Sequence, residues 1–421
     1  MSKRLKVLVS AYACNPAVSP QLHPGEDIVG WQLVNQLCRF HDVWVITHSY
    51  NKKGFGQDYQ EQAISRAKFF FIQLPFPFWL LYKFDIGERL YYYLWQILAW
   101  RIAKRLYKKV PFDLAQHITF NNDWIPSYIG AFMPIPFVWG PLGGGQKTPK
   151  EFFRTYALQD RFAEYVRDFG QVIGRSLLLT RRRCLKRANA ILVCNPDTKK
   201  RMPEKYARKV HFFPVNGISS SDLVDFDELN RKATSEKEFF VLSTGRLIHW
   251  KNFAAAIRSF KIFSDKFPKT RLFIVGEGPQ RDFLQKLARE LKVSDKIGFI
   301  PRLTREELIK KMRACDVFLY PSLREGGGAV VVEALASGLP VICLDLAGPS
   351  IHVREDCGIK IEPRDPDYVL RNMSEALEKL YLDKNRWIQL SQKAVERAKN
   401  HYLWDRLGEH LQEIYERITR S

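Results

Sequence analysis

The chain has 421 residues, of which 46% are hydrophobic, and its 66 Lys and Arg against 45 Asp and Glu give a net charge of +21. A chain this apolar offsets the entropy lost on folding, which excludes disorder over most of its length, and it is long enough for two or three domains. The 24 Gly, the 22 Pro and the lack of a sustained heptad exclude collagen and coiled coil. The positive charge leaves nucleic acid, a membrane and an acidic substrate as candidate partners.

The seven cysteines are an odd number and form no Cys-x-x-Cys pair, which indicates free thiols in a reducing cytosol rather than zinc ligands or disulfides. Residues 1–14 begin like a signal peptide, but Lys6 interrupts a short apolar run, so we expect a buried strand over 5–12. No stretch reaches the roughly 20 apolar residues of a membrane span. The nearest, 69–82, contains Pro75 and Pro77, and we expect it to be buried or to lie on a surface.

Short apolar runs alternate with longer amphipathic ones, which is typical of βα units and a parallel sheet covered on both faces. The strands predicted in the first half are 5–12, 42–49, 68–74, 113–119, 136–140 and 189–195, with helices over 28–40, 88–109 and 151–186. The strands predicted in the second half are 238–246, 270–276, 296–300, 316–322, 339–345 and 357–361, with helices over 252–267, 304–315 and from about 367 onward.

This pattern predicts two Rossmann-like, doubly wound α/β domains. We assign 1–214 to an N-terminal domain, the polar segment 215–237 to a linker, 238–398 to a second domain, and 399–421 to a helix that packs back on the first. Doubly wound sheets bind ligands at the carboxyl ends of their strands. Function is therefore expected at the strand-to-helix turns that face the cleft between the domains.

The segment 321–340, PSLREGGGAVVVEALASGLP, follows a predicted strand and enters a helix. Its three glycines, Gly326, Gly327 and Gly328, allow close approach of a ligand, and helix N-terminal amides attract anions. The carboxylates of Glu325 and Glu333 suit the hydroxyls of a sugar and a ribose, because a phosphate would repel them. The alternative is a tight turn followed by a solvated glutamate.

A second segment, STGRLIHWKNF from residue 243, places Gly245, Arg246 and Lys251 after the first strand of the second domain. Both cations would lie near the switch point of the sheet, where Arg binds a diphosphate bidentately and Lys acts as a point charge. The alternative is two solvated basic residues in a chain that has many.

These segments, together with VGEGPQR from residue 275, resemble the donor-binding domain of family 4 retaining glycosyltransferases (glycosyl transferases group 1), which have the GT-B fold. The order and intervals of the motifs match over 239–361, and VNGIS from residue 215 matches the family's interdomain hinge. Asn252 stands where the family usually has glycine, and Gly327 where it usually has an aromatic residue.

The resemblance implies a role for each matching residue. Arg246 and Lys251 would hold the donor diphosphate, with Gly245 beside them, and Glu325 would hold the transferred sugar. Glu333 would hold the ribose, and Glu277 would lie near the base and ribose.

The N-terminal half is expected to bind the acceptor. Gly25, Glu26 and Gly30 belong to HPGEDIVGW, which we place in a loop between the first strand and the first helix. With AYACNP and VWGPLGGGQ, this segment resembles a bacterial branch of the same family, although Asp27 and Gln146 depart from its pattern. His117, at the end of a predicted strand, matches the histidine that the family places near the transferred sugar; the alternative is a structural histidine.

The resemblance implies a hexosyltransferase that moves a sugar, with retention, from a nucleotide-diphosphate sugar to a glycan or lipid-linked acceptor in cell-envelope or exopolysaccharide synthesis. Because the cations and glycine amides suit the leaving charge, we expect no metal or other cofactor. The two Asp-x-Asp sequences, at 225–227 and 365–367, are interpreted as solvated. A nucleotide-sugar epimerase or an inactive binding protein of the same fold is the alternative.

The remaining positive charge suggests an anionic membrane surface as a further partner. Residues 88–109 alternate large apolar residues with Arg and Lys, and a second basic cluster lies at 181–187. The alternative is a core-packed helix with a solvated cationic face. Nucleic acid is disfavoured because no nucleic-acid motif occurs. We therefore expect a cytoplasmic protein, peripheral on the cytoplasmic face of the membrane.

Overall fold

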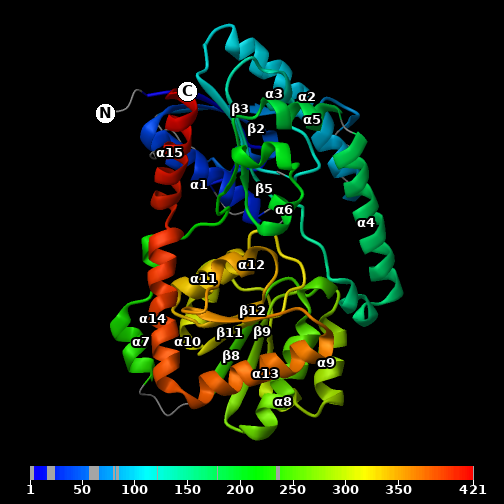
Figure 1. Ribbon diagram of the computed structural model, residues 1–421, viewed down its shortest axis with the longest axis vertical. Coiled ribbons are helices and arrows are strands. Elements are labelled where there is room, and N and C mark those ends of the chain that lie inside the picture. Colours follow the sequence, from blue (N-terminus) through cyan, green and yellow to red (C-terminus); the bar gives the residue numbers. More distant parts are fainter. Residues whose placement is uncertain are drawn as a thin grey trace. The chain divides into compact units, whose positions relative to one another are not determined.

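The computed structural model describes residues 4–16, 24–55, 66–78, 81, 85–120, 122–177, 179–233 and 238–420. The chain divides into two compact units (Figure 1). The first unit comprises Met1–Gly145, Val166–Val215 and Trp404–Ser421, and the second comprises Gln146–Tyr165 and Asn216–Leu403.

The first unit is built on a parallel sheet in the order β3-β2-β1-β4-β5-β6-β7. Its strands are β1 (Lys6–Ser10), β2 (Asp42–His48), β3 (Ala67–Ile72), β4 (Leu114–His117), β5 (Phe137–Leu142), β6 (Ala190–Val193) and β7 (Val210–Phe212). All residues of β4, β5 and β6 are buried, and β5 and β6 are continuous apolar runs, as strands covered on both faces usually are. The order of the strands reverses between β1 and β4, so the switch point lies there.

Helices cover both faces of this sheet. They are α1 (Pro24–Phe40), α2 (Asp85–Tyr107), α3 (Tyr128–Phe132), α5 (Leu179–Arg187), α6 (Pro196–Lys200) and α15 (Trp404–Arg420), with the short 3-10 helices η1 (Ser49–Gly54) and η5 (Glu204–Lys209). Helices α1 and α15 pack in the core on one face, and α2, α3 and α5 pack on the other. On α15, Leu407, Leu411 and Tyr415 follow at intervals of four residues and are buried against the first unit.

The second unit has a parallel sheet in the order β10-β9-β8-β11-β12-β13. Its strands are β8 (Phe239–Thr244), β9 (Thr270–Val275), β10 (Ile297–Ile300), β11 (Val317–Tyr320), β12 (Val341–Leu344) and β13 (Gly358–Ile361). Its helices are α7 (Phe226–Ala233), α8 (Phe253–Lys266), α9 (Arg281–Glu290), α10 (Arg305–Ala314), α11 (Ala329–Ala336), α12 (Ala347–His352), α13 (Pro366–Leu382) and α14 (Lys384–His401), with 3-10 helices η4 (Lys150–Thr155), η6 (Ser220–Asp222), η7 (His249–Lys251) and η8 (Ser294–Lys296).

The core of the second unit has two halves, one on each face of its sheet. Helices α8, α9 and α13 pack on one face, and α10, α11 and α14 pack on the other. The order of the strands again reverses between β8 and β11. The turns after these two strands are therefore the expected ligand-binding position. The predicted fold of two Rossmann-like α/β units is confirmed.

The structure differs from the sequence prediction in four places. Helix α1 begins at Pro24, so most of the segment expected to be a loop is helical; proline suits the first helical position because no helix bond uses its nitrogen. The edge strand β7, with three residues, was too short to predict. The helix expected over 151–186 is divided into η4, α4 (Leu158–Leu177) and α5, and the unit boundary falls within α4. The segment 215–237, expected to be a linker, contains η6 and α7.

The apolar side of α2 lies in the core and not on a surface. Tyr91, Tyr92, Trp95, Ala99 and Ala103 are all buried in the first unit, while the lysines and arginines of the helix point to solvent. This packing favours the core-packed alternative for residues 88–109. Over the part of the chain that the structure describes, no helix is long and apolar enough to cross a membrane.

The packing of α15 predicts that the first unit depends on the last helix of the chain. Leu411 is fully buried, so Leu411→Ala should lower the free energy of unfolding by about 2–5 kcal/mol in urea titrations. Glu413→Ala, on the exposed side of the same helix, should change it by less than about 0.5 kcal/mol. Equal effects of the two substitutions would contradict the assignment of α15 to this core.

Candidate functional site

Three loops meet at the carboxyl edge of the second sheet. The loop after β8 contacts the loop after β9 through the Leu247 amide, which donates to the Glu277 carbonyl at 2.8 Å. Gly276 has φ 144°, and a Cβ on it would lie 2.0 Å from the Gly245 carbonyl oxygen. These two loops therefore require glycine, because their backbones touch.

The turn after β11 brings Glu325 to Lys251. The Lys251 ammonium forms an ion pair with Glu325 Oε2 and donates to the Tyr320 hydroxyl at 2.6 Å. The Tyr320 hydroxyl donates to the same carboxylate oxygen at 2.5 Å. Two predicted donor-binding residues from loops 74 positions apart are thus joined at the switch point of the sheet.

The charges of this triad are set by its surroundings. Burial alone raises the pKa of the Glu325 carboxyl, but Lys251 and the hydrogen bonds outweigh burial, so this pKa lies below its usual value. Burial and the neighbouring Glu325 raise the pKa of Tyr320 well above its usual value. At neutral pH the site therefore holds a carboxylate and a protonated tyrosine.

Helix α12 packs against the turn that contains Gly326, Gly327 and Gly328. Gly328 precedes α11 with φ 64°, a left-handed conformation that glycine adopts without strain. A Cβ on Gly348 would lie 2.6 Å from the Gly326 carbonyl oxygen, and the Gly348 amide donates to the Glu325 carbonyl at 3.3 Å. The glycines thus allow α12 to pack directly on the turn.

His352 fixes the same turn and was not predicted from the sequence. Its Nε2 lies 2.6 Å from the Gly327 carbonyl oxygen, and its Nδ1 lies 2.9 Å from the Tyr402 hydroxyl. Burial lowers the pKa of His352 to about 4, so the ring is neutral at neutral pH. A neutral ring with its proton on Nε2 donates to Gly327 and accepts from Tyr402, which satisfies both contacts.

The other predicted donor residues lie apart from this triad. Arg246 and Glu277 are exposed at the tips of their loops. Glu333 faces α10, where Arg305 Nε lies 3.0 Å from its Oε1 and the same guanidinium binds Asp222 at 2.7 Å. Burial raises the pKa of Glu333 although Arg305 opposes this effect. The role of Glu333 toward a ribose stays a prediction.

A second set of charged side chains, also not predicted, connects α4 to the loops after β8 and β11. Both carboxylate oxygens of Glu164 accept from Arg324, the residue before Glu325. His249 Nε2 lies 3.3 Å from Glu164, and its Nδ1 lies 3.1 Å from Asp160. Glu164 is only 3% exposed. Residues 160 and 164 therefore connect to both donor loops, at separations along the chain that no local pattern reveals.

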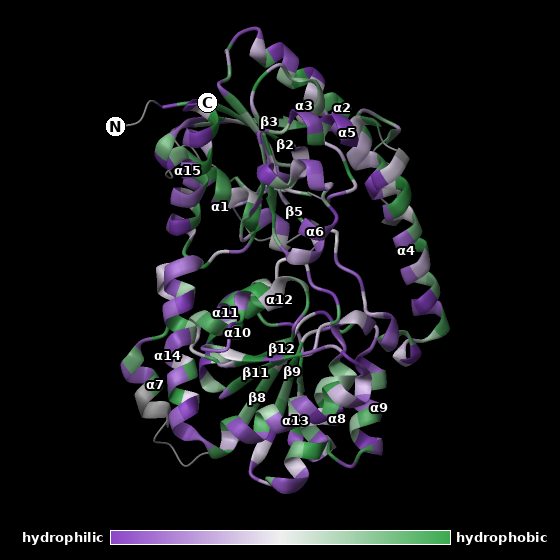
Figure 2. Cartoon of the chain, in the orientation of Figure 1, coloured by the Kyte–Doolittle hydropathy of each residue, from purple (hydrophilic) through white to green (hydrophobic). Residues whose placement is uncertain are grey.

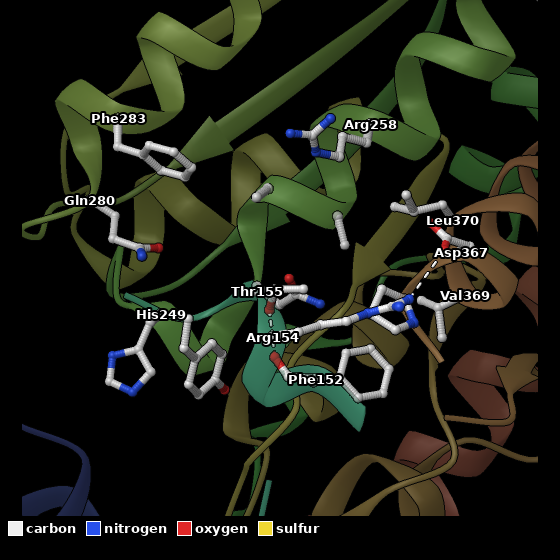
Figure 3. Close-up of a pocket in the computed structure, with 15 residues that line it drawn as sticks. Phe152, Arg154, Thr155, His249, Arg258, Gln280, Phe283, Asp367, Val369 and Leu370 are labelled. Atoms are coloured by element: carbon white, nitrogen blue, oxygen red, sulfur yellow. Dashed lines mark hydrogen bonds and ion pairs between the residues drawn. The ribbon is translucent and has the colours of Figure 1, made fainter. Parts of the chain in front are cut away.

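A pocket of about 370 Å³ lies beside the donor loop after β8 (Figure 3). The segment 152–156 forms one wall of the pocket, with His249, Asn252 and residues of α8, α9 and α13 around it. Arg154 and Asp367 form a 3.1 Å ion pair at its edge. Lys251 and Glu325 do not line it, so this pocket is a neighbour of the triad and not the same site.

In the first unit, His117 and Glu26 lie near the switch point between β1 and β4. His117 Nε2 lies 2.8 Å from the Tyr92 hydroxyl, and Glu26 Oε2 accepts from the Phe120 amide at 2.5 Å. Burial lowers the pKa of His117 to about 4, so its ring is neutral. His117 Nε2 also lies 3.1 Å from the Thr119 carbonyl oxygen.

The two glycines of that segment differ. Gly25 is exposed with open space around it, as close approach of a ligand requires. A Cβ on Gly30 would lie 2.0 Å from the Ala13 carbonyl oxygen. Gly30 therefore serves the packing of α1 against the turn after β1.

The Asp-x-Asp sequences have structural contacts. Asp225 accepts from the Asp227 amide at 3.2 Å, and Asp365 caps α13. Among the described residues, no three His, Cys, Asp or Glu side chains gather as a metal site.

Residues 225–401 match the family of glycosyl transferases group 1. This match covers less than half of the chain. A D-inositol 3-phosphate glycosyltransferase of Nocardia farcinica is 34% identical over 142 residues, 33% of this chain and 30% of the relative. An uncharacterized glycosyltransferase of Haemophilus influenzae is 29% identical over 163 residues, 39% of this chain and 45% of the relative. The chain thus spans less than half the length of these relatives.

Solved structures share the fold over nearly the whole chain. A glycosyltransferase of Rickettsia africae covers 100% of both chains with a TM-score of 0.65 and 13% identity. Sucrose-phosphate synthase of Thermosynechococcus elongatus covers 99% of this chain and 100% of its own, with a TM-score of 0.64 and 16% identity. HepE of Anabaena, in complex with UDP-glucose, covers 99% and 100%, with a TM-score of 0.57 and 14% identity.

The ion pair predicts a pH-dependent stability. Lys251→Met leaves Glu325 without its cation, which should lower the free energy of unfolding by about 2 kcal/mol at neutral pH, less than for a fully buried pair. The native pKa of Glu325 is depressed, so the pair stabilises the fold above the usual glutamate pKa and this contribution is lost as the pH falls through the native value. The difference from wild type, measured in urea, should therefore shrink in acid.

Two variants control this measurement. Lys286→Met removes an exposed cation whose distance to Glu290 is 3.8 Å and should have little effect at any pH. Adding Glu325→Gln to Lys251→Met should restore part of the stability, because no buried charge is then left alone. A pH-independent loss would contradict the proposed charge state.

Proposed function

We propose that the protein is a retaining, metal-independent glycosyltransferase of family 4. It transfers a hexosyl group from a nucleotide-diphosphate sugar to a hydroxyl of a glycan or lipid-linked acceptor in cell-envelope or exopolysaccharide synthesis. The observation that carries the proposal is the joining of Lys251 and Glu325 at the switch point of a glycosyl transferases group 1 domain. The complexes of HepE with UDP and glucose support a nucleotide-sugar donor.

The geometry of Lys251 supports contact with a diphosphate. An ammonium has three N–H donors, and Glu325 and Tyr320 each take one. The third is left for a phosphate oxygen of the donor. Arg246, exposed on the same loop, supplies a second cation, and both stabilise the negative charge that develops on the departing diphosphate.

Glu325 is suited to the transferred sugar. An ionised carboxylate only accepts hydrogen bonds, so it selects hydroxyls and repels phosphate. Lys251 and Tyr320 hold this carboxylate in place before a ligand arrives, which reduces the cost of ordering on binding. Glu277 and Glu333 would then contact the base and ribose.

The transfer itself is proposed as a front-face attack. The acceptor hydroxyl attacks the anomeric carbon as the bond to the phosphate oxygen breaks, and that phosphate oxygen takes the hydroxyl proton. The acceptor is assigned to the first unit, with Gly25, Glu26 and His117 as its predicted contacts. Since His117 is neutral and buried, we assign it to hydrogen bonding and not to charge stabilisation. We place the reaction in the cytoplasm; all seven cysteines are buried free thiols.

Removing either cation tests the assignment. Arg246→Ala and Lys251→Ala should each lower kcat by about 10²–10³-fold, because each loses stabilisation of the leaving charge. Release of nucleotide from a panel of UDP-, GDP- and ADP-sugars, with and without acceptor, measures this effect. Glu325→Ala should reduce turnover similarly.

Lys286→Ala, an exposed cation on α9, is the matched control and should retain wild-type turnover. Circular dichroism confirms that each variant is folded. Wild-type transfer by the Arg246 and Lys251 variants would overturn the assignment. Formation of an isomerised nucleotide sugar without acceptor would indicate an epimerase instead.

A further inference from the structure

Helix α4 exposes an apolar stripe along its whole length. At 100° per residue its members fall within about 120° of the helix circumference. They are Leu158, Phe162, Tyr165, Val166, Phe169, Val172 and Ile173, and their exposed fractions range from 40% to 81%. Both hydrophobic and hydrophilic residues occur along α4 in Figure 2. A solvent-exposed apolar surface of this extent indicates a binding partner.

The opposite face of α4 is polar and buried, which reverses the usual pattern of a surface helix. In the second unit, Glu164 binds Arg324 and His249. In the first unit, Arg175 Nε lies 2.6 Å from Asp123, and Arg175 Nη2 lies 3.1 Å from the buried Gln171. Each part of the helix is thus held by polar contacts within its own unit, and its apolar side chains are the exposed ones.

The stripe carries no charge that would repel an anionic surface. At 100° per residue the uncharged Ser176 falls within the arc of the stripe, and Gln159 and Arg161 border it, so the one charge beside the stripe along this helix is positive. The carboxylates of α4 are on its other sides and are paired: Asp160 with His249, Glu164 with Arg324 and Asp168 with Arg167.

Exposed cations lie at the end of the stripe. Helix α5 follows α4 directly and exposes Arg182, Arg183, Lys186 and Arg187. The Arg182 guanidinium donates to the Ser176 carbonyl at 3.1 Å, which places it at the last turn of α4. A second copy of the chain would itself carry a net charge of +21, so charge favours an anionic occupant.

We propose that α4 lies in the interface of an anionic membrane, with its apolar stripe among the acyl chains and the cations of α5 on the lipid headgroups. A helix of 20 residues is about 30 Å long. With one polar, ion-paired face, it lies on the bilayer and does not cross it. The contact surface is thus α4 and not α2, whose apolar side is in the core. This membrane binding needs neither the nucleotide-sugar donor nor the acceptor substrate, so its test is independent of the proposed reaction.

Vesicle sedimentation with the full chain tests the proposal. The protein should bind vesicles of equimolar phosphatidylcholine and phosphatidylglycerol, bind phosphatidylcholine alone weakly, and lose affinity as salt is raised. Phe162→Ser with Phe169→Ser should weaken binding about 10–100-fold, because two aromatic groups leave the acyl region. The matched control, Phe283→Ser with Leu382→Ser, removes two exposed apolar side chains of the second unit and should bind as wild type.

A direct readout of insertion uses the thiols. All seven native cysteines are buried, so an environment-sensitive dye on Phe169→Cys reports that position. Its emission should shift to the blue with anionic vesicles, whereas the dye on Phe283→Cys should not respond. The proposal is overturned by absent binding, by binding that the serine variants leave unchanged, or by a wild-type dimer that those variants dissociate in sedimentation velocity.

Discussion

The ion pair between Lys251 and Glu325 is the contact on which the candidate site depends. It joins the loop after β8 to the turn after β11. The strand order of the sheet reverses between these two strands. Tyr320, the last residue of β11, binds both partners and so ties the pair to the sheet itself. Since each charge is partly buried, neither is stable there without the other. The conformation of both loops is therefore a single, cooperative arrangement.

The glycines of the site support this arrangement from the backbone side. Gly276 lets the loop after β9 touch the loop after β8, and Gly348 lets α12 touch the turn that carries Glu325. Both glycines thus serve the packing of the loops. The structure shows that the turn of the glycine-rich segment is tight for packing reasons, and that the same turn places a carboxylate beside a lysine.

The fold was largely predictable because most of its buried parallel strands are apolar runs, and the meeting of Lys251 with Glu325 could be expected because the turns after neighbouring strands carry glycine and charge. Each predicted strand coincides with an observed one, and among the strands of the described residues the three-residue β7 alone was missed. The start of α1 was missed because two glycines suggested a loop, although Gly30 is required where α1 touches Ala13. His352, Arg305 and Glu164 were not predictable, since each acts through a residue 25 to 160 positions away.

Helix α4 takes part in both the candidate site and the proposed membrane-binding surface. Its first two turns carry Asp160 and Glu164, which hold His249 and Arg324 beside the donor residues, and the same turns carry Leu158 and Phe162 outward. A rotation of the helix by one residue would turn Glu164 toward solvent and break a buried ion pair. The direction in which Leu158 and Phe162 point is therefore coupled, through Asp160 and Glu164, to the position of the turn before Glu325.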